Sequence, residues 1–430
     1  MKLWKKDYSL NEKIENFTVG NDRVSDLVLA EFDITASIAH AKMLCKSKIL
    51  SADEKNQIIS ELKKIKSKIN EGSFKIEKRF EDVHSKIEFL LVEKLGDIGK
   101  KIHTGRSRND QVLVATQLYL KSEIIIIKKM VKSLFDILID KAKQNKNKLM
   151  PGYTHLQVAM PSSFGLWFSA YAEALIDDII YLNTAYKINN QNPLGSAAGY
   201  GSSFNIDREY TTKELGFETL KFNVLSAQFN RGRVEESVAH AIGTLAKTLS
   251  KLSTDICFYM TSELNFISFP DNYTTGSSIM PHKKNPDVFE LVRARCNNIQ
   301  SLHNQLTFIT NNLTSGYHRD FQLMKEKIID GVQNIKSCLE ILSFSIKKVE
   351  IRDNILENHN YKYINSVDAL NNLIKKENMP FRDAYTKISS DIKKNKFKLT
   401  KRNKHTLTGS IDNLCLNKIE KKMNNNFIPI

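Results

Sequence analysis

Length, composition and charge limit what this chain can be. It has 430 residues, of which 41% are hydrophobic and 26% charged, as is ordinary for a globular protein of about three domains, or two with one large. Its 17 glycines and 8 prolines are roughly half the usual share, which predicts a mostly helical chain. No apolar run approaches the ~18 residues of a membrane span, and no apolar segment follows the charges of residues 1–6, so we expect neither a membrane segment nor a signal peptide.

The net charge of +16 allows two interpretations. One is binding to nucleic acid or another polyanion, and the other is a set of lysines spread over solvated helix faces with some bias toward small anions. The lysines are scattered, and their densest cluster, residues 393–404, contains one aromatic residue, Phe397, which favours the second interpretation. The five cysteines form no C-x-x-C pair, which predicts neither disulfides nor a zinc site and fits the cytoplasm.

The N-terminal part, residues 1–107, is predicted to be a mostly helical domain with shorter helices than the rest of the chain. Residues 51–54 (SADE) form a capping-box pattern, in which Ser51 and Glu54 would satisfy the first backbone N–H groups of a helix. That helix should end near Gly72, since glycine is favoured just beyond a helix C-terminus.

Residues 108–351 are predicted to form a central bundle of long helices. In the first of them, apolar residues from Ile127 to Ala142 recur at helical spacing. Each helix would be ~40 Å or longer, which predicts an elongated all-α five-helix bundle whose broad apolar faces are shared with other subunits. The five helical segments are 111–150, 162–189, 233–264, 286–313 and 320–351. Residues 352–430 are predicted to be a small, basic, helical domain with breaks at Pro380 and Gly409.

Unusual residues collect in the polar connections between these helices. The first such connection, residues 103–111 (HTGRSRNDQ), precedes the first long helix. Its Ser107, Asn109 or Asp110 would serve as ordinary N-caps. Equally, Arg108 and Asn109 at a helix N-terminus form an anion site, since arginine grips a carboxylate and the backbone N–H groups favour it. From the residues alone, the N-cap interpretation and the anion-site interpretation are equally supported.

The second connection, residues 151–157 (PGYTHLQ), is predicted to be a loop that contains a threonine and a histidine. A single histidine in a loop more often has a structural role than a catalytic one. The neighbouring hydroxyl strengthens the functional interpretation, in which Thr154 binds a substrate while His155 moves a proton.

The third connection, residues 275–286 (TGSSIMPHKKNP), is either a flexible loop or a mobile catalytic one. Asn285 is predicted to cap the next helix, with Pro286 in its first turn. In the functional interpretation Ser277 is a base whose alkoxide is stabilised by Lys283 and the helix end in a closed, dry site. Glu290 would hold a lysine or a histidine in place, or is simply an acidic residue at a helix start.

The fourth segment, residues 317–325 (YHRDFQLMK), begins the last long helix. Gln322 and Lys325 are three residues apart and therefore share one helix face. On its own this is a weak indication, because polar helix starts are common.

Together these segments resemble a known family. Residues 276–286 resemble the signature loop of the fumarase/aspartase superfamily, and residues 103–111 resemble the form particular to argininosuccinate lyases. Residues 151–157 match the Thr-His loop of that family. Shorter matches extend the resemblance over nearly the whole chain; they are residues 81–84 (EDVH), 192–196 (NPLGS), 207–209 (DRE) and 379–384 (MPFRDA).

The chain also departs from the family in places. Residues 226–231 (SAQFNR) replace a stretch that usually carries an Asp-Ala pair and an acidic run. His282 occupies a position where argininosuccinate lyases often have glutamine. A histidine at this position resembles the pattern of adenylosuccinate lyases. Residues 17–23 match poorly, and the C-terminal domain is short. These departures concern substrate contacts and regulation more than the class of reaction.

The resemblance implies a carbon–nitrogen lyase that reversibly cleaves L-argininosuccinate to L-arginine and fumarate, the last step of arginine biosynthesis, by general acid/base catalysis. It implies a cytoplasmic homotetramer with active sites shared between subunits, with no metal and no organic cofactor. Two alternatives are adenylosuccinate lyase, which residues 106–109 (RSRN) argue against, and a basic nucleic-acid-binding or structural protein. The presence of Ser277, His155 and Lys283 argues against the latter.

The resemblance also implies residue roles. Ser277 and His155 carry the two proton transfers, and which of them takes the proton is left open. Lys283 and Glu290 complete the implied catalytic set. The implied substrate-binding residues are Asp82, His84, Arg108, Asn109, Thr154, Asn285, Tyr317, Gln322 and Lys325.

Overall fold

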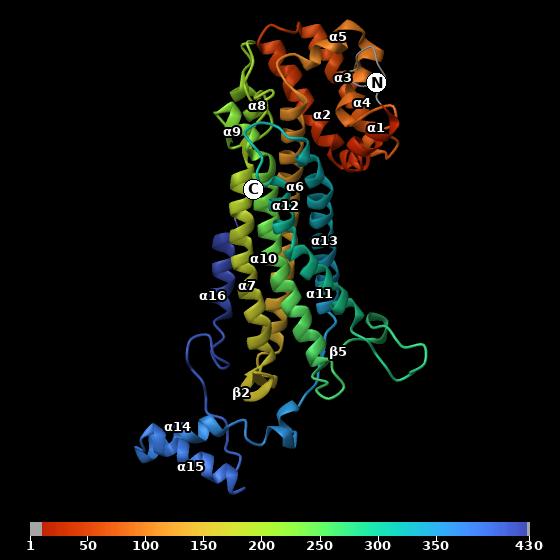
Figure 1. Ribbon diagram of the computed structural model, residues 1–430. Coiled ribbons are helices and arrows are strands. Elements are labelled where there is room, and N and C mark those ends of the chain that lie inside the picture. Colours follow the sequence, from red (N-terminus) through yellow and green to blue (C-terminus); the bar gives the residue numbers. More distant parts are fainter. Residues whose placement is uncertain (1–10, 428–430) are drawn as a thin grey trace. The chain divides into compact units, whose positions relative to one another are not determined.

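The computed structural model describes residues 11–427, so residues 1–6, on which the signal-peptide expectation rests, lie outside the described chain. Helices and strands of the chain are labelled in Figure 1. The chain divides into two compact units. The first comprises the residues up to 127 together with 181–244 and 298–335, and the second comprises 128–180, 245–297 and 336 onward. Helices α6, α7, α10, α11 and α13 contribute to both units. The predicted boundaries at residues 107 and 351 stay a prediction.

Five helices open the first unit: α1 (Glu12–Val19), α2 (Asp22–Lys46), α3 (Ala52–Asn70), α4 (Val83–Leu95) and α5 (Asp97–Lys100). Their shared core contains fully buried Ile34, Leu44 and Ile58. The predicted capping box is confirmed, because Ser51 Oγ accepts from Glu54 N (3.2 Å) and the Glu54 carboxylate accepts from Ser51 N (2.9 Å). The helix ends at Asn70, two residues before Gly72, as the sequence predicts.

The rest of the first unit contains parts of the long helices, together with shorter elements. These elements are α6 (Arg108–Gln144), α7 (Phe164–Asn189), α8 (Arg208–Glu214), α9 (Val224–Gln228), α10 (Asn230–Tyr259), α12 (Leu302–Thr310), α13 (Gln322–Ile346) and the parallel strands β3 (Gln191–Asn192) and β4 (Thr219–Leu220). Buried Arg231 on α10 donates from its guanidinium to Thr116 Oγ1 on α6 (3.2 Å) and to the carbonyl of Phe321, directly before α13 (3.0 Å).

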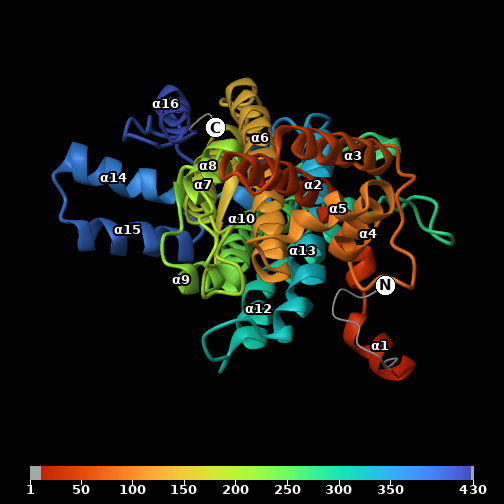
Figure 2. The same ribbon diagram turned by 90° about the horizontal axis from the view of Figure 1, so that it is seen from above.

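The second unit combines the other parts of the long helices with small elements. These elements are α11 (Asp287–Gln300), α14 (Ser366–Glu377), α15 (Phe381–Lys393), α16 (Leu416–Asn426) and the antiparallel pairs β1 (Leu149–Thr154) with β2 (Gln157–Ser163) and β5 (Ile267–Ser268) with β6 (Glu350–Ile351). Trp167 on α7 packs edge-on against Tyr259 on α10 and donates to Asp255 Oδ2 (3.0 Å). Figure 2 shows α14 and α15 side by side. Across residues 11–427, none of the helices is both long and apolar enough to cross a bilayer.

The all-α class predicted from the sequence is confirmed, but several predicted helix bounds are wrong. The first long helix ends at Gln144 rather than at residue 150, because β1 begins at Leu149. The predicted fourth helix is two helices, α11 and α12, which are interrupted at Ser301. The last long helix ends at Ile346 rather than at 351, where β6 pairs with β5. Neither glycine nor proline marks these ends. Strand pairing, at β1 and at β6, follows two of them, so local propensity alone does not set them.

The capping box gives a test of local stability. Replacing Ser51→Ala should lower the free energy of unfolding by about 1 kcal/mol, because the N–H group of Glu54 loses its acceptor. The matched control is Ser60→Ala on the exposed side of the same helix, which should be neutral or slightly stabilising since alanine has the highest helix propensity. Equilibrium unfolding in urea measures both, and equal effects of the two variants would contradict the capping role.

Candidate active site

A cavity of about 350 Å³ lies in the first unit, between the start of α6 and the segment that precedes α13. Its walls include Arg108, Asn109 and Tyr317, three of the residues singled out in the sequence, together with His103 and Arg319. Sequence reasoning missed Arg319, although it lies between Tyr317 and Gln322 in a segment already chosen. The cavity therefore presents two guanidinium groups, an amide and a phenol to a ligand.

Two carboxylates lie behind Arg108. Asp82 is the N-cap of α4, and its Oδ1 accepts from Ser85 N (2.8 Å) while its Oδ2 accepts from Arg108 Nη2. Glu81 Oε2 accepts from Arg108 Nη1 (3.2 Å). Burial alone would raise the pKa of Asp82, but His84 and Arg108 together lower it below its usual value. Asp82 is therefore an ionised group that holds Arg108 in place, and it lies beneath the guanidinium rather than on the cavity wall.

His84 links three elements of the first unit. Its ring lies in the interior, with Nδ1 3.0 Å from Asp33 Oδ1 on α2, and the same oxygen accepts from Gln111 Nε2 on α6 (2.9 Å). Burial lowers the pKa of His84, but the carboxylates of Asp33, Asp82 and Asp26 outweigh burial and raise it above the ordinary value. His84 thus ties α4 to α2, and the raised pKa favours its protonated form more than in an ordinary histidine.

Gln322 and Lys325 share one face of α13, as their spacing predicts, and both contact the N-terminal helices. Gln322 Nε2 donates to the carbonyls of Thr18 (2.9 Å) and Val19 (3.0 Å), at the end of α1. Lys325 Nζ donates to Asp26 (2.6 Å) and pairs with Asp22 (2.8 Å). Burial would lower the pKa of Lys325, but these two carboxylates raise it, so the ammonium stays charged although it is buried.

The Thr-His segment in the second unit is a β-hairpin rather than the loop expected from its sequence. Thr154 ends β1 and pairs with Gln157 at the start of β2, so His155 and Leu156 form a two-residue turn. Both turn residues have positive φ, 53° and 58°, a conformation in which asparagine and glycine are the usual residues. Such backbone strain concentrates at functional sites. The turn holds His155 at an exposed tip.

The structure distinguishes the two serines of the 276–286 loop. Ser277 Oγ accepts hydrogen bonds from the backbone N–H groups of Ile279 (3.3 Å) and Met280 (3.2 Å). These donors point at the oxygen that would carry negative charge if the hydroxyl lost its proton. No such donor reaches Ser278 Oγ from the residues that the structure describes.

The base of this loop is closed by a short antiparallel bridge, in which Asn285 N donates to the Thr275 carbonyl (2.8 Å). The Asn285 side chain donates to the Gly276 carbonyl (3.2 Å), so it fastens the loop and does not cap the helix as predicted. The helix α11 begins at Asp287, one residue after Pro286.

Two charged residues of the predicted catalytic set lie near this loop. Lys283 is exposed on it, whereas the neighbouring Lys284 pairs with Asp271. Glu290, one turn into α11, forms an ion pair with Arg293 on its own helix (3.8 Å).

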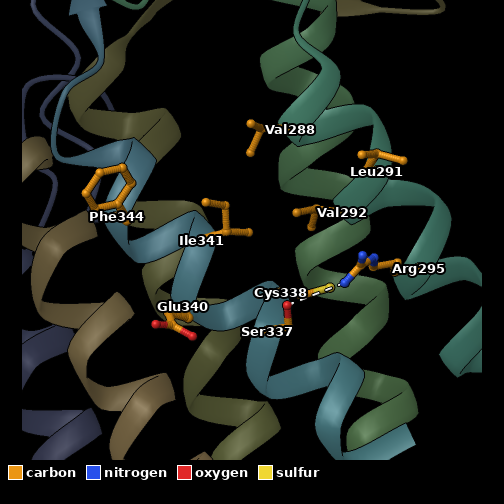
Figure 3. Close-up of a pocket in the computed structure, with 9 residues that line it drawn as sticks. All are labelled: Val288, Leu291, Val292, Arg295, Ser337, Cys338, Glu340, Ile341 and Phe344. Atoms are coloured by element: carbon orange, nitrogen blue, oxygen red, sulfur yellow. Dashed lines mark hydrogen bonds between the residues drawn. The ribbon is translucent and has the colours of Figure 1, made fainter. Parts of the chain in front are cut away.

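A second cavity, of about 410 Å³, lies in the second unit between α11 and α13 (Figure 3). Leu291, Val292, Ile341 and Phe344 give it an apolar wall, and none of the residues predicted for catalysis or substrate binding lines it. It is therefore not the site suggested by the sequence. Among residues 11–427, no group of three histidine, cysteine, aspartate or glutamate side chains lies close enough to hold a metal ion.

Comparison with known proteins gives the family. A family model described as lyase matches residues 11–301. An argininosuccinate lyase of Phocaeicola vulgatus is 51% identical over 422 residues, which cover 98% of this chain and 94% of the relative. One from Thermotoga neapolitana is 40% identical and covers 90% of this chain and 97% of the relative. This chain belongs to the argininosuccinate lyase family, in the fumarase/aspartase superfamily.

Solved structures with the same fold include other lyases. An EDDS lyase variant with bound fumarate has a TM-score of 0.77 at 18% identity and covers 98% of this chain and 90% of its own. A fumarate lyase:delta crystallin from Brucella melitensis bound to cobalt has a TM-score of 0.73, also at 18% identity, and covers 98% of this chain and 94% of its own. These likenesses agree with the all-α fold of the argininosuccinate lyase family.

Two buried histidines in the first unit predict opposite pH dependences. The pKa of His84 is raised by its carboxylates, so its stabilising contribution is complete below about pH 6.5 and is lost as pH rises through the raised pKa. The pKa of His40 is lowered well below 6.5 by burial and by Arg106, and its Nε2 lies 3.0 Å from the Thr104 carbonyl. The contribution of His40 is therefore present above about pH 6.5 and is lost as pH falls.

The measurement is urea unfolding of the wild type, His84→Gln and His40→Gln between about pH 5 and pH 9. The stability difference between wild type and His84→Gln should shrink toward high pH, and that for His40→Gln should shrink toward low pH. Parallel pH dependences of the two differences would contradict the charge states assigned here.

Proposed function

We propose that this protein catalyses the reversible elimination of L-argininosuccinate to L-arginine and fumarate in the cytoplasm, as the last step of arginine biosynthesis. The observation that carries the proposal is its similarity to argininosuccinate lyases over nearly the whole chain, at up to 51% identity. The cavity with Arg108, Asn109 and Tyr317 supports it, since the substrate carries three carboxylates that such groups bind.

The reaction removes a proton from carbon beside a carboxylate and expels the guanidino group. That carbon acid is very weak, so the negative charge that develops on the carboxylate must be stabilised by fixed cations and N–H donors. Arg108 and Asn109 of the first unit and Lys283 and Asn285 of the second are the groups proposed for this task. Thr154, Tyr317, Gln322 and Lys325 are proposed to bind the remainder of the substrate, with Asp82 and His84 holding the arginine-bearing wall in place.

Ser277 and His155 are proposed to divide the two proton transfers. The two backbone N–H groups that donate to Ser277 Oγ would stabilise an alkoxide, which favours the serine as the base. His155 would then protonate the leaving guanidino group. Glu290 is proposed to hold a charged partner near the loop.

We also propose that the protein is a homotetramer with active sites shared between subunits, because the proposed residues lie at opposite ends of a long helix. Arg108 and Asn109 lie at the start of α6, whereas Thr154 and His155 follow its C-terminus, and a helix of 37 residues is about 55 Å long. A second copy of the chain is therefore proposed to complete each site. Exposed apolar side chains around the α11–α13 cavity (Figure 3) support association, since Leu291 is 59% and Phe344 56% exposed.

Ser277→Ala should reduce fumarate release from argininosuccinate by about 100-fold or more, because an essential proton-transfer group is lost. The matched control is Ser278→Ala on the same loop, which should have a milder effect. Fumarate is followed by its ultraviolet absorbance, and circular dichroism checks the fold of both variants. Near-normal activity of a well-folded Ser277→Ala protein, or the reverse ranking of the two serines, would refute the assignment.

Shared sites predict complementation between two inactive variants. Ser277→Ala and His155→Asn are mixed, dissociated in mild denaturant and reassembled, and part of the activity should return because some sites then combine intact segments from different subunits. Each variant treated alone is the control. Persistent inactivity despite demonstrated subunit exchange, or an active monomer by light scattering, would exclude the shared-site arrangement.

A further inference from the structure

A single buried carboxylate joins the two arginines of the first-unit cavity. Glu81 Oε2 accepts from Arg108 Nη1 (3.2 Å), and Glu81 Oε1 accepts from Arg319 Nη2 (2.9 Å). Glu81 is only 3% exposed, whereas the side chains of Arg108 and Arg319 are 29% and 49% exposed and both line the cavity. The acid thus lies behind the two guanidinium groups, which face the solvent side.

We propose that Arg319 is a substrate-binding residue that, beside Arg108, binds a carboxylate of the substrate, and that Glu81 is the positioning residue that fixes the two guanidinium groups. The inference rests on the proposed function for the identity of the ligand. It adds two residues to the site, since neither Arg319 nor Glu81 belongs to the set derived from the sequence.

The hydrogen bonds of Arg319 leave donors for a ligand. Within residues 11–427, the guanidinium donates through Nη2 to Glu81 and to the Thr18 carbonyl (2.8 Å). Both of these hydrogen bonds use Nη2, so the N–H groups of Nε and Nη1 are available to bind a ligand. A side chain anchored in this way loses less conformational freedom when a carboxylate binds, which is the usual benefit of preorganisation.

Electrostatics explains why an acid belongs behind these arginines. Two guanidinium groups on one cavity wall repel each other, and Glu81 between them offsets that repulsion in the free protein. A carboxylate entering the cavity meets the arginines first and Glu81 at a greater distance, so attraction by the nearer charges outweighs repulsion by the farther one. Replacing Glu81→Gln keeps the shape of the side chain but removes this charge.

A purely structural role for Arg319 would have a different signature. Its bond to the Thr18 carbonyl fastens the end of α1, so its loss could simply loosen this part of the unit. Arg23 provides the matched control, because it donates to the carbonyls of Phe80 and Lys78 (both 2.8 Å) and so fastens the segment directly before Glu81. Arg23 does not line the cavity.

The test is steady-state kinetics of fumarate release by the full-length protein. Arg319→Gln should raise KM for argininosuccinate about tenfold to a hundredfold, the range expected for one charge-assisted hydrogen bond, with a much smaller change in kcat. Arg319→Lys should recover part of the affinity because it keeps the positive charge. Glu81→Gln should raise KM in the same direction, and Arg23→Gln should leave KM near the wild-type value.

Product inhibition identifies the carboxylate. If Arg319 binds the amino-acid half, Arg319→Gln weakens inhibition by arginine alone, and if it binds the succinyl half, the variant weakens inhibition by fumarate alone. Unchanged KM and unchanged inhibition by both products, or an equal rise of KM in Arg23→Gln, would overturn the inference while leaving the proposed function intact. A wild-type protein that releases no fumarate would instead overturn the proposed function itself.

Discussion

The buried ion pairs at the start of α4 are the interaction on which the first-unit site depends. Asp26 accepts the backbone N–H of Val83 at this helix start (3.1 Å) and also binds Lys325 Nζ (2.6 Å). One residue away, Asp82 caps the helix and holds Arg108. Because a buried charge without its partner is strongly destabilising, loss of either partner in one of these pairs would be costly. The helix start is therefore linked through polar contacts to α2, α6 and α13 in this unit.

Outside this network, the groups proposed for chemistry lie where long helices begin or end. A helix supplies a rigid body, and its ends supply unpaired backbone groups and a change of chain direction. The 276–286 loop illustrates this, since the bridge between Thr275 and Asn285 closes it directly before α11 and two of its own N–H groups point at Ser277. In the same way, the hairpin between α6 and α7 carries His155 in its turn. Rigid helices with specialised ends allow precise placement of a few polar groups on an otherwise apolar bundle.

Much of this could be predicted from the sequence because the signals are local. Scarcity of glycine and proline predicted the all-α class, and the SADE pattern predicted the start of α3 at Ala52. The hairpin was missed because its turn residues, His155 and Leu156, lack the usual Asn-Gly signature. The role of Glu81 was missed for a different reason, since it meets Arg319 across 238 residues of sequence and no local pattern encodes such a pair. Packing of distant segments, not propensity, decides those features.

The reaction assigned to this chain is the cleavage of argininosuccinate, as in the argininosuccinate lyases to which it is similar over nearly its whole length. The most direct measurement compares the initial rates at which one purified preparation releases fumarate from argininosuccinate and from adenylosuccinate. Adenylosuccinate is the second substrate because the histidine at position 282 resembles the pattern of adenylosuccinate lyases. We expect saturable release from argininosuccinate, with arginine formed in equal amount, and no comparable release from adenylosuccinate. Faster release from adenylosuccinate, or none from argininosuccinate, would contradict the assigned reaction.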